Sequence, residues 1–402
     1  MNRALACVIG DLSIVRALGQ RGIPVALAAP RGSNPSLSRY CRTLIPTPSF
    51  VDDPDGAVDA LLEWGKAQTP APVVFYQGDH DLLALSRHRE RLAPYLRCVL
   101  PRGRLVEDLV DKLRFAALAE RLSLDVPRTQ ILERHMNIAR VCQRWEHFPC
   151  VLKPTLRMHW FGSELQAQAT GTQKALRVEN RQALLELVPL IEEHETSLVL
   201  QAAIEGGEDR IVSYHAYVRP SGEVVTEFTG RKVRTSPRRY GVSTCVEITD
   251  DPRLKRLGRE VMARLEFSGV LKIDFKYDER DRKHYVLEVN PRFNLWHHPA
   301  TLAGTCVPEL VYNDCVEPGG PPPPKPKLRP GVRWVTLRDD YHAFKEYRAA
   351  GELSAVGWLF DLATAEVNED FRISDPVPGL VQLFGVAQRK LRRLLHNRKG
   401  IE

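Results

Sequence analysis

Two short stretches, residues 270–276 (VLKIDFK) and 285–294 (YVLEVNPRFN), place polar side chains inside runs that otherwise read as buried strands. Side chains of a strand alternate between its two faces. The first stretch is therefore predicted to bury Leu271, Ile273 and Phe275. The second is predicted to bury Tyr285, Leu287 and Val289. Asp274, Glu288 and Asn290 then lie on the opposite face, and the question is what needs them there.

The polar residues DERDRK between the two strands indicate a hairpin turn. If the strands pair with their polar faces aligned, Asp274 and Glu288 repel each other unless a cation lies between them. Oxygen ligands suit Mg²⁺, which binds carboxylates together with substrate phosphates. Asp274, Glu288 and Asn290 are therefore predicted to bind Mg²⁺, with Mn²⁺ as an alternative. The other interpretation is a solvent-exposed face on which acids and lysines alternate for solubility.

Composition limits the class of protein. A chain of 402 residues suggests two or three domains with cores of ordinary size. The formal net charge is +7, and six of these charges lie near the C-terminal end, at Arg389, Lys390, Arg392, Arg393, Arg398 and Lys399. The nearly neutral remainder argues against a nucleic-acid partner. The scattered cysteines and the lack of a signal peptide or a long apolar segment predict a cytoplasmic protein.

The pattern along the chain divides it into four parts. Residues 1–104 alternate apolar strands with short helices, which predicts a Rossmann-like parallel α/β domain, although the G-x-G-x-x-G fingerprint is absent. Residues 105–317 are predicted to be α+β with antiparallel hairpins. The stretch 318–330, PGGPPPPKPKLRP, reads as a stiff linker. Residues 331–402 are predicted to form a helical C-terminal extension with a basic tail.

Three lysines accompany the carboxylate strands. Lys153 ends an apolar strand in CVLKPT, and Lys112 begins a helix in LVDKLRFAALAERL. Lys174 lies in TGTQKA, a run of small residues that can close backbone amides and an ammonium over phosphates. The Walker A pattern is absent. Taken singly, each lysine has the sequence context of a surface residue.

In this order the segments resemble the ATP-grasp superfamily. The resemblance covers roughly residues 1–305 and rests on DK before VPRT, on VLKP, on LVLQAAIEGGED, and on KIDF followed by LEVNPRF. Within the superfamily the chain is similar to carboxylate-amine ligases of the D-aspartate ligase type, through VLKP, GTQKALRV and GRKVRTSPRRYGVST. The resemblance implies a Rossmann-like N-terminal domain followed by an ATP-grasp fold that uses ATP and Mg²⁺.

The resemblance also implies roles for individual residues. Contacts to ATP phosphates are implied for Lys112, Lys153 and Lys174. A hinge that hydrogen-bonds adenine is implied for Gln201, Ala202, Ala203 and Ile204. Glu208 matches the ribose contact, with Glu205 as a rival, and Asp274, Glu288 and Asn290 match the metal ligands. Arg292, with Lys153, matches the catalytic cations that stabilise the transferred phosphoryl group. The phosphate loop of this chain lacks the family's glycines, so Lys174 departs most from the pattern.

The implied chemistry is formation of an amide through an acyl phosphate, with release of ADP and phosphate. The substrates are expected to be an amino or sugar acid and an amine acceptor, with a role in envelope or glycan precursor modification. The predicted substrate contacts are Arg231, Lys232, Arg234 and His297. Two alternatives stay open, a carboxylase or carbamoyl-phosphate-type enzyme that uses bicarbonate, and a regulatory protein that binds ATP without turnover.

The C-terminal stretch LVQLFGVAQRKLRRLLHNRK has leucines close to helical spacing, with basic residues between them. This pattern is typical of an interfacial helix on anionic lipid, which predicts peripheral contact with the inner face of a membrane. The alternative is a helix docked on the body of the protein. Homodimerisation is left open.

Overall fold

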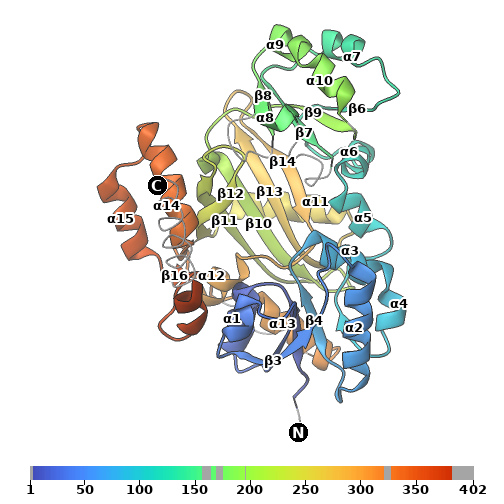
Figure 1. The fold of residues 1–402 in the computed structure, drawn as a ribbon, viewed down its shortest axis with the longest axis vertical. Helices are drawn as coiled ribbons and strands as arrows, with labels where there is room; N and C mark the ends of the chain where they lie inside the picture. Colours follow the sequence, from blue (N-terminus) through green and yellow to red (C-terminus); the bar gives the residue numbers. More distant parts are fainter. Residues whose placement is uncertain (1–2, 156–163, 169–174, 195, 321–326, 383–402) are drawn as a thin grey trace, which may run out of the picture.

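The computed structural model describes residues 3–155, 164–168, 175–194, 196–320 and 327–382. Its strands form three sheets, and Figure 1 shows them stacked along the long axis of the molecule. A parallel sheet lies at the bottom, a large mixed sheet in the middle and a small antiparallel sheet at the top. This arrangement confirms the mixed α/β and α+β class predicted from the sequence.

The parallel sheet has the strand order β3-β2-β1-β4-β5. Its strands are β1 (Ala6–Ile9), β2 (Val25–Ala29), β3 (Cys41–Pro46), β4 (Val73–Tyr76) and β5 (Arg97–Cys98). Alternate side chains face two separate cores, one shared with α1 (Leu12–Gly19) and one with α2 (Pro54–Lys66) and α3 (Asp79–Arg87). Both faces of the central strands β1, β2 and β4 are covered, which explains why these three strands are apolar throughout.

The large sheet has the order β14-β13-β10-β11-β12-β15-β16. Its strands are β10 (Ile211–Val218), β11 (Val224–Ser236), β12 (Val242–Thr249), β13 (Gly269–Asp278), β14 (Lys283–Asn290), β15 (Arg333–Val335) and β16 (Val367–Asn368). One face packs on α11 (Pro252–Arg264) and α6 (Lys112–Arg121). The other face is covered only in part, by the core that includes the parallel sheet, α12 (His297–Leu302) and α13 (Val307–Val316). The candidate site uses the remaining part of that second face.

The small sheet has the order β6-β9-β7-β8. Its strands are β6 (Thr129–Leu132), β7 (Cys150–Pro154), β8 (Leu176–Val178) and β9 (Leu198–Ala202). One face packs on α7 (Ile138–Arg144), α9 (Arg181–Glu186) and α10 (Val188–Glu193). The other face looks toward the large sheet. Of the shorter helices, α8 (Glu164–Gln168) contacts this part of the fold, at β8 and α10 (Figure 1). Helix α4 (Arg89–Leu92) contacts α3, and α5 (Leu105–Val110) contacts α3 and α6.

The hairpin of β13 and β14 has the predicted register, because Asp274 is the direct partner of Glu288. Leu271, Ile273 and Phe275 are fully buried, as expected. A register shift between Asp274 and Phe275 changes the phase of β14, so Val286 enters the core and not Leu287. The assignment of Leu287 to the buried face was therefore wrong. A bulge of this kind cannot be read from alternation, since it interrupts the alternation.

The C-terminal region differs from the predicted helical extension. Besides α14 (Leu337–Ala349) and α15 (Ala355–Thr364), it contributes β15 and β16 to the large sheet. Arg234 on β11 holds these helices, since its guanidinium donates to Asp340 at 2.8 and 2.9 Å and also pairs with Asp361. The extension is thus an integral part of the large sheet and of the helices that pack on it.

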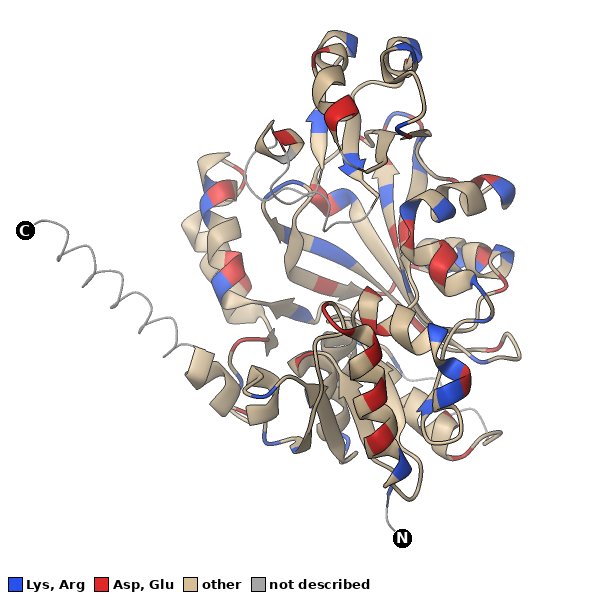
Figure 2. Ribbon diagram, turned by 45° about the vertical axis from the view of Figure 1, so that its right-hand side comes forward, with Lys and Arg blue, Asp and Glu red and all other residues tan. Residues whose placement is uncertain are grey.

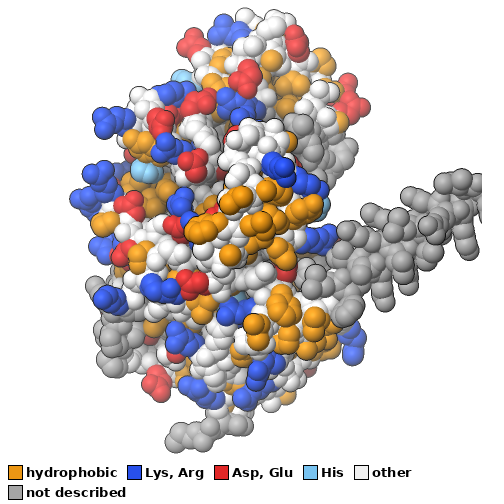
Figure 3. Space-filling model, turned by 90° about the vertical axis from the view of Figure 1, so that its left-hand side faces the viewer, with side chains coloured by type: hydrophobic (Ala, Val, Ile, Leu, Met, Phe, Trp, Pro, Cys, Tyr) orange, Lys and Arg blue, Asp and Glu red, His pale blue; other side chains and the backbone are white. Residues whose placement is uncertain are grey.

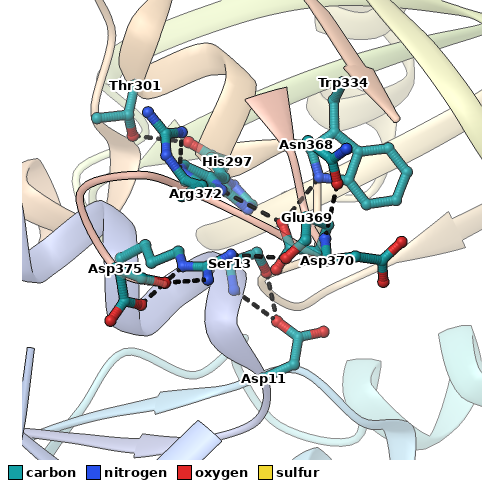
Figure 4. A network of polar contacts seen from close by, with 12 residues as sticks. Asp11, Ser13, His297, Thr301, Trp334, Asn368, Glu369, Asp370, Arg372 and Asp375 are labelled. Carbon is teal, nitrogen blue, oxygen red and sulfur yellow. Dashed lines mark hydrogen bonds and ion pairs between the residues drawn. The ribbon is translucent and has the colours of Figure 1, made fainter. Parts of the chain in front are cut away.

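A second buried ion pair joins the two ends of the chain. The Nε atom of Arg16 on α1 lies 2.9 Å from Oδ2 of Asp375, and both side chains are almost fully buried. Asp375 also accepts hydrogen bonds from Ser38 and from the backbone of Arg39. Figure 4 shows this network, in which the segment after β16 lies against α1. In the described part of the chain, no helix combines the length and apolar character needed to cross a membrane.

Candidate functional site

The centre of the candidate site is Asp274, on the open face of the large sheet. Its carboxylate is 1% exposed and lies 2.8 Å from the Lys272 ammonium and 3.6 Å from that of Lys232. Ser213 donates a hydrogen bond to its other oxygen at 2.5 Å. Burial raises the pKa of Asp274, but the two ammonium groups outweigh burial and hold the pKa below the usual carboxyl range. A buried, ionised carboxylate contradicts the interpretation of a solvent-exposed face.

Glu288 lies opposite Asp274, and its side chain is 56% exposed. The amide of Asn290 donates to Glu288 Oε1 at 3.0 Å. Arg292 continues this line, because its guanidinium donates to Asn290 Oδ1 at 3.3 Å. The structure therefore brings the three predicted metal ligands and the predicted catalytic arginine to one edge of the sheet.

The donor set fits a hard cation. Asp274, Glu288 and Asn290 present carboxylate and amide oxygens, which Mg²⁺ and Mn²⁺ prefer, and the exposed Glu288 leaves room for further oxygen ligands from phosphates. No group of three or more His, Cys, Asp or Glu side chains suited to a metal occurs within the described residues. An all-protein cage is thus not offered there. A site completed by nucleotide phosphates agrees with two carboxylates and one amide.

The small sheet supplies the second wall. Leu152, Leu198 and Leu200 point into its core, so the alternate positions Lys153 and Gln201 lie on the face toward the large sheet. Lys153 donates to Gln201 Oε1 at 2.8 Å. Burial and, to a smaller extent, the charge of Lys112 lower the pKa of Lys153 to about 8, although the charge of Glu288 opposes this shift. Figure 2 shows Lys and Arg residues on strands of both the large and the small sheet. A cluster of basic residues creates a positive potential that attracts polyanions.

The predicted hinge follows β9. Ala202 and Ala203 donate their backbone N–H groups to the carbonyls of Arg128 and Pro149. Ile204 is buried and has no backbone hydrogen bond to any residue in the described ranges. A buried backbone without a partner is costly unless a ligand or water satisfies it. Of the four predicted hinge residues, Ile204 therefore has the backbone groups best suited to a planar ligand such as adenine.

The remaining predicted nucleotide contacts differ in whether other residues of the protein already bind them. Glu205 forms an ion pair with Arg177 at 3.0 Å, whereas Glu208 makes no ion pair with a described residue. Glu208 therefore suits a ribose contact better than its rival. Lys112 donates to the Pro154 carbonyl at 2.9 Å, next to Lys153. Lys174 lies outside the described residues.

The carboxyl ends of β1 and β4 in the parallel sheet lie next to Arg292. The strand order of this sheet reverses between β1 and β4, and ligands of open α/β sheets bind beyond the carboxyl ends of strands at such a point. Asp11 follows β1, and Gln77 and Asp79 follow β4. Gln77 packs so closely on Gly10 that a Cβ atom there would lie 2.0 Å from its Oε1 atom. This end of the parallel sheet is connected to the candidate metal site, because Arg292 Nε donates to Asp79 Oδ1 at 2.5 Å.

Asp11 is an exposed carboxylate held at the carboxyl end of β1 by hydrogen bonds. Ser13 and Gln77 bond its Oδ1 atom, at 2.5 and 2.9 Å, while no described residue bonds Oδ2. The side chain remains accessible to solvent, but the surrounding protein raises its pKa, and the charge of Glu369 raises it further. An accessible carboxylate with one unbonded oxygen suits an amine or hydroxyl group of a ligand.

Of the four predicted substrate residues, Lys232 contacts Asp274 at the site, whereas Arg231, the preceding residue of β11, lies on the opposite face of the sheet. Burial lowers the pKa of Lys232, but the charges of Asp274 and Glu288 outweigh it, so the pKa is raised and the ammonium is retained. Arg231 forms an ion pair with Glu247 at 3.0 Å. Glu247 also pairs with Arg333, so Arg231 is already neutralised by the protein.

The structure argues against a substrate contact for Arg234 and for His297. Arg234 is 2% exposed, and its charge is used by Asp340 and Asp361, so it holds α14 and α15 in place and does not face a ligand. His297 is fully buried beside Phe228 and Phe293, and burial lowers its pKa to about 4. Its imidazole is neutral and inaccessible. The loop-like sequence around Arg234 misled the prediction, since the acidic partners lie more than 100 residues further along the chain.

Sequence reasoning missed three contributors. Lys272 and Ser213 both bond Asp274, and Asp79 bonds Arg292. A signal existed for Lys272, which alternates with Asp274 in KIDF, and for Asp79, which follows a strand of the parallel sheet. Ser213 could not be identified, because its role depends on β10 pairing with β13.

Comparison with solved structures shows that the chain has the ATP-grasp fold, as predicted from the sequence. N5-carboxyaminoimidazole synthetase from Staphylococcus aureus, complexed with ADP, has a TM-score of 0.62 and 16% identity, covering 87% of each chain. L-amino acid ligase from Bacillus licheniformis has a TM-score of 0.54 and 16% identity, covering 79% of this chain and 74% of that one. Biotin carboxylase from Campylobacter jejuni has a TM-score of 0.60 and 13% identity, covering 83% and 74%.

Among curated proteins, the chain is similar to D-aspartate ligase of Enterococcus faecium (strain Aus0004). The two are 25% identical over 245 residues, which is 60% of this chain and 57% of the relative. The similarity therefore spans little more than half of that protein. The sequence matches no protein-family model.

Proposed function

We propose that the chain is an ATP-dependent carboxylate-amine ligase. The observation that carries the proposal is the paired position of Asp274 and Glu288, facing Lys153 across the gap between two sheets. Two carboxylates and an amide on one wall suit a divalent cation bound to phosphates. A buried lysine on the other wall suits the phosphates themselves. The ADP-bound structures with the same fold support this assignment.

In the proposed reaction, a substrate carboxylate oxygen attacks the γ-phosphorus of ATP, and the bond to the β-phosphate oxygen breaks. ADP leaves, and an acyl phosphate remains. The amine then attacks the acyl carbon, loses a proton, and expels phosphate to give the amide. A divalent cation, held by Asp274, Glu288 and Asn290 when bound, neutralises phosphate charge. Arg292 is placed to stabilise the phosphoryl group and the acyl phosphate, because its fixed charge suits a developing anion.

The acceptor amine is proposed to bind beyond the carboxyl ends of β1 and β4. This end of the sheet is connected to Arg292 through Asp79, and Asp11 offers an unbonded oxygen there. Lys232 is the proposed contact for the acid. Aspartate, as either enantiomer, is the first acid to test because of the similarity to D-aspartate ligase. A role in envelope or glycan precursor modification would follow if the acceptor is such a precursor.

The test is ATP consumption with Mg²⁺, pools of amino and sugar acids, and hydroxylamine as a surrogate amine. ADP together with a hydroxamate would support the acyl-phosphate route and identify the acid. AMP would contradict it. Consumption that depends on bicarbonate, without a hydroxamate, would favour the carboxylase alternative. ATP binding without consumption in any mixture would favour a regulatory protein.

We also propose that the basic C-terminal segment contacts the inner face of a membrane. The segment lies outside the described residues, so the proposal rests on the sequence of residues 383–402, which contains six basic residues and one acidic residue. Homodimerisation stays a separate proposal. Size-exclusion chromatography with light scattering tests it directly, since a monomer at all concentrations contradicts it.

A further inference from the structure

An apolar surface covers one side of the C-terminal part. Helix α15 has no buried residue, although five of its ten side chains are large hydrophobic groups or tryptophan. Val356, Leu359 and Phe360 are 78%, 58% and 64% exposed. They are spaced i, i+3 and i+4, so they share one face of the helix. Isolated exposed apolar residues need no explanation, but a shared face does.

A second group follows β16. Ile373 is 91% exposed, and Val377, Leu380 and Val381 are 47%, 41% and 48% exposed. Residues 377–382 are helical, and the three exposed apolar positions there again have the spacing i, i+3 and i+4. Figure 3 shows hydrophobic side chains in two neighbouring groups on the face that carries the C-terminal helices. We define these seven residues of α15 and 373–381 as the C-terminal apolar surface.

Contacts on the inner side of α15 hold this surface in place. On the inner side of α15, Trp358 stacks on Phe344 at 4.6 Å and donates to Asp340 at 2.9 Å. Asp361 of the same helix pairs with Arg333 and Arg234. The charged and aromatic side chains of α15 thus attach it to the large sheet, and its aliphatic side chains and Phe360 face outward. This inverts the usual orientation of an amphipathic helix on a protein core.

We infer that the C-terminal apolar surface binds an anionic phospholipid surface. The helical residues 377–382 lead directly into the segment 383–402, which contains six Lys and Arg residues and a single acid. Apolar side chains beside a cluster of cations match the acyl boundary and the headgroups of an anionic bilayer. A second copy of the chain fits less well, since docking would bring two strongly basic segments together.

This inference extends the proposed membrane contact of the basic segment and does not depend on the reaction. The test uses the full chain and sedimentation with vesicles of phosphatidylglycerol and phosphatidylcholine, against vesicles of phosphatidylcholine alone. The double variant Phe360→Ser and Ile373→Ser is compared with Val51→Ser, which removes a 55% exposed apolar side chain before α2. Soluble-substrate turnover is measured in parallel, because it reports on the ligase proposal and not on this one.

The expected result is binding of the wild type to the anionic vesicles, weaker at high salt. The double variant should lose affinity by on the order of tenfold or more, with the control and the turnover unchanged. Equal binding of the double variant and the wild type would overturn the inference. So would a dimer without lipid that the same two substitutions dissociate, because the surface would then be an interface between copies.

Discussion

Arg292 and Asp79 join two sheets at the proposed site of phosphoryl transfer. The Nε atom of Arg292, just after β14, lies 2.5 Å from Oδ1 of Asp79, the first residue of α3. They are 213 residues apart in the sequence. The contact places the guanidinium between the candidate metal-binding edge of the large sheet and the carboxyl ends of β1 and β4, where the acyl phosphate and the amine would meet in the proposed reaction.

Arg292→Lys is expected to lower turnover by on the order of 100-fold or more, because a lysine cannot reproduce the planar, multiply donating guanidinium. ATP affinity should change little. Asp79→Asn keeps the arginine but weakens its orientation, so a smaller loss, about tenfold, is expected. Steady-state kinetics with the identified acid measure both. Equal turnover of Arg292→Lys and the wild type would remove the catalytic assignment.

Glu288→Gln is expected to abolish ATP consumption while leaving the circular dichroism and the melting temperature unchanged. Glu288 is exposed, and the glutamine side chain has the same size and shape as the glutamate that it replaces. Glu279→Gln, in the turn of the same hairpin, is the control and should remain active. Asp274→Asn is a less specific test. It leaves the ammonium groups of Lys272 and Lys232 without their shared carboxylate, which costs about 1–3 kcal/mol of stability. Retained turnover in Glu288→Gln would contradict the metal assignment.

The arrangement of the hairpin was predictable because alternation is a local property. Leu271, Ile273 and Phe275 are buried as expected, and Asp274 meets Glu288 across the pair. The burial of Asp274 was not predictable in the same way. It depends on Ser213 and Lys232, which come from two other strands, and sequence alone gives no register between those strands.

The errors share one physical origin. Arg234 looked like a ligand-binding residue because its neighbours are basic and its partners, Asp340 and Asp361, lie far along the chain. His297 follows the motif LEVNPRF, yet it is the first residue of α12 and is buried against Phe228 of β11. Charge and proximity in sequence indicate where a site is. Which side chains face it depends on tertiary contacts.

Lys153 predicts a pH dependence of nucleotide affinity. Its pKa is lowered to about 8 from an ordinary value of 10.5, so the ammonium is present below about pH 8 and lost above it. The Kd for ATP should be flat at lower pH and then rise, by up to about tenfold per pH unit, as the charge is lost. Isothermal titration over this range measures it. Lys153→Arg should show no such rise, because arginine stays charged.

The same lysine predicts the sign of a stability effect. Between about pH 8 and 10.5 the unfolded chain holds the Lys153 proton and the folded chain does not, so this group makes the unfolding free energy rise with pH in that window. The cost of burying the ammonium is fully present below about pH 8. Lys153→Met is therefore expected to raise the melting temperature at neutral pH and to reduce ATP affinity. A lower melting temperature would contradict the burial of an unpaired charge.

Arg234→Met tests whether this arginine holds the C-terminal helices or binds substrate. The substitution leaves Asp340, which is buried, without its guanidinium partner, a change that typically costs about 3–5 kcal/mol. Hydrogen exchange should increase in α14 and α15, and the melting temperature should fall. Arg231→Met removes a more exposed cation from the same strand and should affect stability far less. If Arg234→Met instead raised the KM for the acid, and hydrogen exchange in α14 and α15 did not change, the structural role of Arg234 would be wrong. The result would then support Arg234 as a substrate contact.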